Sequence, residues 1–196
     1  MEQLAKTVVV SIDDRLANPG DTLPVVGHLS IEEVALGDRK FALSDGMDYD
    51  VLLTNVGEGI LATGILRARV NTTCDRCLDE TTLDIAGEVD EYFLFREPDH
   101  GVRGDDDEEE GPDYTLIGDD HAIDLTDALS AAFVMEIPYV VLCKEDCAGL
   151  CPMCGENLNH VDCGHAEQLA AQAEADRIAS SPFAKLRDLY PASEDE

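Results

Sequence analysis

The stretch that decides the fold of the C-terminal third is Cys143-Lys144-Glu145-Asp146-Cys147-Ala148-Gly149-Leu150-Cys151-Pro152-Met153-Cys154-Gly155-Glu156-Asn157-Leu158-Asn159-His160-Val161-Asp162-Cys163-Gly164-His165. Within it, Cys151-Pro152-Met153-Cys154-Gly155 has the form of a zinc knuckle. A C-x-x-C spacing lets a tight turn aim two thiolates at one ion, and the following glycine permits a close backbone approach around sulfur. Cys163 and His165 are within reach to complete a tetrahedron.

A second pair, Cys74-Asp75-Arg76-Cys77, ends a long β-prone run and suits another knuckle. With all seven cysteines and His165 as ligands, two four-coordinate zinc sites could be filled. The preferred partition is Cys151, Cys154, Cys163 and His165 around one ion, and Cys74, Cys77, Cys143 and Cys147 around the other. The alternative is a ribbon in which Cys74 and Cys77 join Cys151 and Cys154. One site with spare cysteines, or His160 in place of His165, also remains open.

The apolar content of residues 143–165 gives an energetic reason to expect a metal. Its sizeable apolar side chains are Leu150, Met153, Leu158 and Val161. Burial of so few groups cannot order the segment, whereas a structural zinc can contribute on the order of 10 kcal/mol. The competing interpretation is that some of the cysteines are simply buried free thiols.

The charge balance restricts the class of partner. The chain of 196 residues has 43 acidic residues against 13 Lys and Arg, a formal net charge of −30. Such a field repels phosphate backbones and attracts basic proteins. An acidic proteome, in which the charge only maintains solubility, would explain the net charge equally well.

The N-terminus lacks the features of a secretory signal, and no run has the roughly 20 apolar residues of a membrane helix, so we expect a cytoplasmic protein.

The N-terminal half reads as a β-rich meander. We expect strands around Val8–Ile12, Val25–Leu29, Phe41–Leu43, Val51–Val56, Ile60–Val70, Leu83–Ala86 and Val89–Phe95, with turns at 44–46 and 57–59. Asp124 can cap a helix from Leu125 that has Leu129, Ala132 and Phe133 on one face. Tyr139–Leu142 would form a short strand or a buried extension.

These elements predict an α+β fold with an antiparallel sheet, a helix packed on it and a C-terminal zinc-binding knob followed by short helices. The expected divisions are a core over 1–142 with a disordered acidic loop near 97–120, the cysteine cluster over 143–165, and helices with an acidic tail over 166–196. The last part contains an Ala- and Glu-rich helix over 164–179 and a final short helix that begins at Ser181-Pro182.

An enzyme is not indicated by the sequence. There is no Gly-rich phosphate loop, Ser nucleophile elbow or His-Glu zinc-protease helix. The Cys74–Cys77 pair has a redox spacing, but it follows a strand and has acidic neighbours, which raise a thiol pKa. A thiol redox or zinc-responsive regulatory protein is therefore the alternative function rather than the leading one.

Several motifs in order resemble the YceD family of proteins associated with accumulation of large-subunit ribosomal RNA. These are Cys74-Asp75-Arg76-Cys77-Leu78, Ile123-Asp124-Leu125, Glu136-Ile137-Pro138, the segment from Leu142 to Asn159, and Pro182-Phe183-Ala184-Lys185-Leu186. Members of the cysteine-rich type usually end the cluster with Cys-x-Cys, where this chain has Cys163-Gly164-His165. Zinc accepts histidine, so the site can survive this change.

The resemblance implies a non-catalytic role in large ribosomal subunit biogenesis and 23S rRNA accumulation. The family's gene often neighbours that of the small basic ribosomal protein L32. Together with the net charge of −30, this favours a basic large-subunit ribosomal protein such as L32 as the partner over direct RNA contact.

Overall fold

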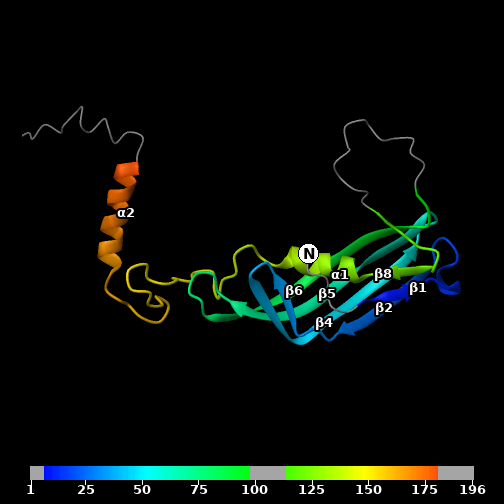
Figure 1. Ribbon diagram of the computed structural model, residues 1–196, viewed down its shortest axis with the longest axis horizontal. Helices are drawn as coiled ribbons and strands as arrows, with labels where there is room; N and C mark the ends of the chain where they lie inside the picture. Colours follow the sequence, from blue (N-terminus) through cyan, green and yellow to red (C-terminus); the bar gives the residue numbers. More distant parts are fainter. Residues whose placement is uncertain (1–6, 98–113, 181–196) are drawn as a thin grey trace, which may run out of the picture. The chain divides into compact units, whose positions relative to one another are not determined.

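The computed structural model of the chain describes residues 7–97 and 114–180. The chain divides into two compact units, Met1–Cys74 with Asp79–Cys143, and Asp75–Leu78 with Lys144–Glu196. The first unit holds the sheets and one helix, and the second holds the cysteine-rich loops and the other helix (Figure 1). The elements support an α+β fold, although the main sheet is mixed rather than purely antiparallel.

Long antiparallel strands form the body of the first unit. The main sheet has the order β2-β4-β5-β6-β7, with β3 paired to β4, and β1 pairs with β8 in a small second sheet. All pairs are antiparallel except β6 with β7. The bounds are β1 Val9–Ser11, β2 Thr22–Leu29, β3 Glu33–Leu36, β4 Arg39–Asn55, β5 Gly59–Thr73, β6 Glu80–Leu94, β7 Thr115–Leu116 and β8 Ala122–Asp124, with a short 3-10 helix at Asp14–Leu16.

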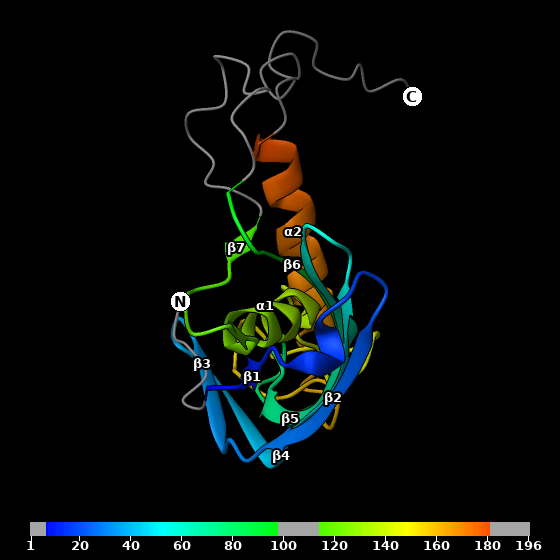
Figure 2. The same ribbon diagram turned by 90° about the vertical axis from the view of Figure 1, so that its right-hand side faces the viewer.

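The core lies between one face of the main sheet and helix α1, Thr126–Glu136 (Figure 2). The predicted helix face is confirmed, since Leu125, Leu129, Ala132 and Phe133 are all buried. The helix begins one residue later than predicted, with Leu125 at the N-cap position. Asp124 still caps the first turn, because its Oδ1 accepts from the Thr126 N–H at 2.9 Å.

The predicted turn at residues 44–46 is wrong, because β4 continues through it. Leu43 is opposite Val70 and Met47 is opposite Ala68, so residues 44–46 bulge opposite Arg69 alone. Gly46 makes the sequence of residues 44–46 resemble that of a turn. It has φ of 68°, and a Cβ there would lie 2.2 Å from the carbonyl oxygen of Leu29. The turn predicted at 57–59 is found one residue earlier, because residues 56–58 connect β4 to β5 and Gly59 is the first residue of β5.

The two strands predicted over Leu83–Ala86 and Val89–Phe95 are one strand, β6. Gly87, which lies between the two predicted strands, serves packing. A Cβ on Gly87 would lie 2.2 Å from the carbonyl oxygen and 2.6 Å from the carbonyl carbon of Ala132 on α1. The missing side chain therefore lets the helix backbone approach the sheet closely.

Three other expectations concern the remaining segments. The extension Tyr139–Leu142 forms no strand. Val141 is its only buried residue, whereas Tyr139 and Val140 are exposed. Of the acidic loop predicted near 97–120, residues 98–113 lie outside the described residues, and β7 occupies Thr115–Leu116. The final short helix predicted from Ser181 also lies outside the described residues.

In the second unit, the predicted helix over 164–179 is observed as α2, Ala166–Ser180. The N–H of Leu169 donates to the carbonyl oxygen of His165 at 2.9 Å, so the first turn starts at His165. None of its residues is buried. Across 7–97 and 114–180, neither helix combines the length and apolar character that a membrane crossing requires.

The close approach at Gly87 gives a test of the core. We expect Gly87→Ala to lower the free energy of unfolding of the first unit by about 1–3 kcal/mol, because the methyl group must push α1 away from β6. Gly118→Ala is the matched control, since a Cβ there meets only the movable Asp120 side chain, at 3.1 Å. Chemical denaturation followed by circular dichroism measures both. Equal stability of the two variants would contradict the packing argument.

Candidate metal centre

The second unit has no apolar core of its own among its described residues. Every member of the hydrophobic core cluster belongs to the first unit. The buried apolar side chains of the described second unit are all cysteines, namely Cys77, Cys147 and Cys151. Burial of three thiols cannot offset the loss of chain entropy over these loops, which is roughly 1–2 kcal/mol for each ordered residue. A further source of stabilisation is needed, and the cysteines are gathered in groups that could supply it by holding metal ions.

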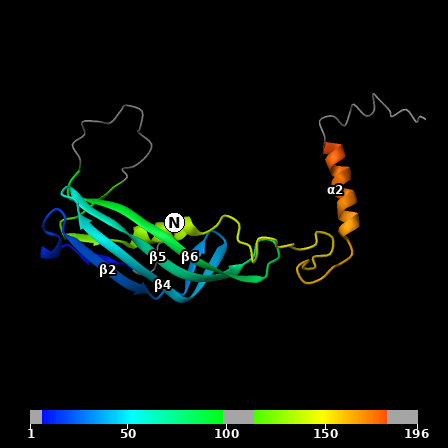
Figure 3. The same cartoon turned by 180° about the vertical axis from the view of Figure 1, so that it is seen from behind.

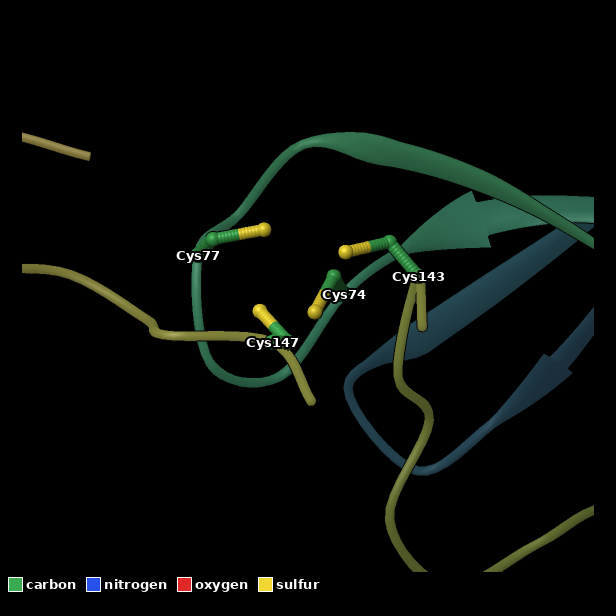
Figure 4. Close-up of side chains that lie close together, drawn as sticks. All are labelled: Cys74, Cys77, Cys143 and Cys147. Atoms are coloured by element: carbon green, nitrogen blue, oxygen red, sulfur yellow. The ribbon is translucent and has the colours of Figure 1, made fainter. Parts of the chain in front are cut away.

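One group of thiols comprises Cys74, Cys77, Cys143 and Cys147, and their sulfur atoms all lie within 4.8 Å of one another. Figure 4 shows the four sulfurs converging, two from the loop after β5 and two from the segment after α1. The loop is closed by a hydrogen bond of 2.8 Å from the Cys74 N–H to the carbonyl oxygen of Asp79. Cys74, Cys77 and Cys147 are buried.

The other group comprises Cys151, Cys154, Cys163 and His165, whose ligand atoms again lie within 4.8 Å of one another. The sulfur of Cys151 is 3.7 Å from His165 Nδ1. The knuckle is a tight turn in which the Gly155 N–H donates to the Cys151 carbonyl oxygen and the Cys151 N–H donates to that of Glu156, both at 2.8 Å. Gly155 has φ of 77°, which favours glycine at the position that follows the second cysteine.

Both groups fit a tetrahedral metal ion. Zinc–sulfur bonds of about 2.3 Å place the sulfurs of a tetrahedral site about 3.8 Å apart, which agrees with donors gathered within 4.8 Å. Their members are the same as in the partition preferred from the sequence, and they differ from the ribbon alternative. His160 is in neither group. Each group can therefore hold a metal ion.

The backbone around the knuckle favours thiolate at Cys151. Burial acts to raise the pKa of this thiol, but hydrogen bonds from the backbone N–H groups of Cys154 and Met153 and from neighbouring thiols outweigh it and bring the pKa to about 6. The pKa of Cys154 is raised. The Glu156 N–H acts to lower it, but burial and the thiols of Cys151 and Cys163 prevail. A cation among these sulfurs would favour the thiolate form of all of them.

Backbone hydrogen bonds tie the knuckle to the turn that carries Cys77. The Leu150 N–H donates to the carbonyl oxygen of Arg76 at 3.0 Å, and the Leu158 N–H donates to that of Gly149 at 2.9 Å. Gly149 has φ of 77°, and a Cβ there would lie 3.1 Å from the Arg76 oxygen. Since Leu150 also forms a β-bridge with Asn157, the three short segments hold one another in place.

Asn159 connects this network to a sulfur of the first group. Its Oδ1 accepts from the Ala148 N–H at 2.9 Å, and its Nδ2 lies 3.3 Å from the sulfur of Cys147. A backbone N–H can only donate, so the orientation of the amide is fixed and Nδ2 must donate to sulfur. A donor to a ligating thiolate is an outer-shell interaction that orients the ligand.

The sequence alone did not reveal this role of Asn159. The only signal was the pattern Asn157-Leu158-Asn159 soon after the knuckle, which carried the family resemblance but no assigned chemistry. Asn157 supports Asn159, because its Oδ1 accepts from both the backbone N–H at 2.9 Å and Nδ2 at 3.0 Å of that residue. Two asparagines in this spacing can thus form an outer shell.

Asn159→Asp tests the outer shell. The substitution keeps the oxygen that accepts from Ala148, removes the donor to Cys147 and adds a negative charge beside the sulfur. With Co²⁺ as a spectroscopic probe, we expect binding at the first group to weaken by about 10- to 100-fold. Gln172→Glu on exposed helix α2 is the control of equal charge. Unchanged Co²⁺ affinity of Asn159→Asp would show that the contact is incidental.

Comparisons with known proteins agree with the motifs. A family model described as "Large ribosomal RNA subunit accumulation protein YceD" matches residues 62–190. Uncharacterized proteins of Mycobacterium bovis and Mycobacterium tuberculosis are each 30% identical over 135 residues, which is 69% of this chain and 60% of theirs. One of Mycobacterium leprae is 25% identical over 144 residues, 74% of this chain and 61% of its own. No solved structure matches. Because the family model covers more than half of the sequence, including both cysteine groups, the chain belongs to the YceD family.

Proposed function

We propose that this chain is a non-catalytic accessory factor for large ribosomal subunit biogenesis, which promotes accumulation of 23S rRNA through protein contacts. The family description supports the ribosomal part of this proposal. The structural part of the proposal rests on one observation about the second unit. The only apolar side chains that its described residues bury are cysteines, and these cysteines belong to groups that can hold metal. In this proposal the metal is structural zinc, one ion in each group.

The donor sets support a structural ion. Thiolate and imidazole are ligands that zinc prefers, whereas calcium and magnesium select oxygen. A catalytic zinc needs one open coordination position, and four protein donors leave none. Each group supplies four donors, so we assign no reaction to either ion.

The net charge of −30 supports a basic protein as the partner. Nucleic acid is bound mainly through Lys and Arg contacts to phosphate, and this chain has 13 such residues against 43 acidic ones. A basic large-subunit ribosomal protein such as L32 would instead be attracted by the same field. The role in rRNA accumulation would then be indirect, through the assembly of a protein that binds the RNA.

Metal content discriminates this proposal from a thiol redox or regulatory role. Protein purified without added zinc should contain roughly two zinc ions per chain and few reactive thiols. Stripping the metal with a strong chelator should unfold residues 144–165, since zinc supplies on the order of 10 kcal/mol for such segments. Hydrogen exchange should show this loss while the sheet of the first unit stays protected. Absence of metal combined with a rapidly cycling disulfide would favour the redox alternative.

Depletion of the protein tests the biological role. We expect a depleted strain to accumulate less 23S rRNA and to show a deficit of large subunits in its ribosome profile. Wild-type protein should restore both, and Cys151→Ser/Cys154→Ser should not, because it removes two donors of one group. Normal 23S rRNA levels in the depleted strain would refute the proposed function, whatever the metal content.

A further inference from the structure

The face of the main sheet opposite α1 exposes apolar side chains near its centre. Along each strand, successive side chains point to opposite faces, and those of the inner face pack in the core. On the outer face, Val26 of β2 is 71% exposed, Leu52 of β4 41% and Ile65 of β5 36%. The strands that carry them lie side by side in Figure 3, in agreement with their pairing.

The register places carboxylates among these apolar side chains. Val26 is opposite Asp50, Asp50 is opposite Ile65, and Ile65 is opposite Glu88, so the four form one row across β2, β4, β5 and β6. The next row, two residues along, contains Leu52 and, on β6, Asp90. Neighbours within a row have Cβ atoms about 4.5–5.5 Å apart. We call this set, Val26, Asp50, Leu52, Ile65, Glu88 and Asp90, the outer patch.

The carboxylates of the outer patch have no ion-pair partner among the described residues, although Arg67 of β5 lies in the next row of the same face, opposite Asp48. Asp50, Glu88 and Asp90 form no ion pair or side-chain hydrogen bond with another described residue. Elsewhere on the same face, by contrast, Asp48 pairs with His28 at 2.8 Å and Asp84 pairs with Arg69 at 2.7 Å. Three unpaired carboxylates against the one guanidinium of Arg67 leave the surface around the exposed apolar side chains negative.

This combination restricts what can cover the patch. A second copy of the chain would bring like charges together, and nucleic acid would bring phosphate against the carboxylates, and both are unfavourable. A Lys- or Arg-rich polypeptide fits, because its ammonium or guanidinium groups can pair with the carboxylates while its aliphatic stems cover the apolar side chains. We infer that the outer patch is the docking surface for a basic protein segment. The inference rests on the proposed function for the identity of that protein.

Charge reversal within the patch tests the inference. The probe is the mixture of proteins extracted from purified large ribosomal subunits and freed of RNA, with the captured protein identified and its affinity then measured singly. We expect Asp50→Lys/Glu88→Lys to weaken binding about tenfold or more and to reduce its salt dependence. Glu58→Lys/Asp119→Lys is the control, because both residues are exposed and the net charge changes equally. The control should bind within about twofold of wild type.

A second pair of substitutions separates apolar contact from charge. Leu52→Thr/Ile65→Thr leaves the net charge unchanged, so it should weaken binding without altering its dependence on salt. All substituted side chains are exposed, and circular dichroism should show that each variant folds.

Each outcome decides the inference. Loss of binding in the patch variants, with the control intact, supports it. Binding by Asp50→Lys/Glu88→Lys that equals the control overturns it, and so does a wild-type chain that captures no large-subunit protein. Neither result decides the proposed role in rRNA accumulation, which depends on the depleted strain. If depletion lowers 23S rRNA and the patch variants restore it fully, the role stands and the docking surface is wrong.

Discussion

The convergence of sulfur atoms is the interaction on which the C-terminal part of this protein depends. Residues 144–180 bury no aliphatic or aromatic side chain, and the cysteines that they bury face other donors. Bonds to a metal ion, as we propose, would order these loops, whereas the hydrophobic effect orders the sheet and α1. With metal bound as we propose, the protein would combine two sources of stability that respond to different conditions. In that case heat and denaturant would act mainly on the first unit, whereas chelators, acid and oxidation would act on the second.

The two groups of donors are not independent in structure. The Arg76 carbonyl beside Cys77 accepts from Leu150, which precedes Cys151 of the other group, and Asn159 donates to Cys147. A change that loosens the knuckle at 151–155 will therefore be felt at the Cys147 sulfur through backbone hydrogen bonds and one amide. If both groups bind metal as proposed, such shared scaffolding would favour filling of both together over filling of one alone.

The sequence predicted the features that follow from local chemistry. The spacing of Cys151 and Cys154 indicated a knuckle, and the apolar face of α1 followed from Leu125, Leu129, Ala132 and Phe133. The turn predicted at 44–46 was wrong and the role of Gly87 was not predicted, because Gly46 and Gly87 are explained only by distant partners, Leu29 and Ala132. The contact of Asn159 with Cys147 was hidden for the same reason, since it depends on how the loops fold back. A single sequence does not show which residues far apart in the chain lie close together in the fold.

The bulge in β4 has a consequence for how this chain can change in length. Residues 44–46 stand opposite one residue of β5, which is two more than a regular ladder requires. An even number of extra residues leaves the alternation in phase, so Leu43 before the bulge and Met47 after it are both buried. Deletion of a single residue here would turn every side chain of β4 on one side of the deletion to the opposite face of the sheet. Deletion of a pair would keep each side chain on its own face, so natural length variation at this point should occur in steps of two.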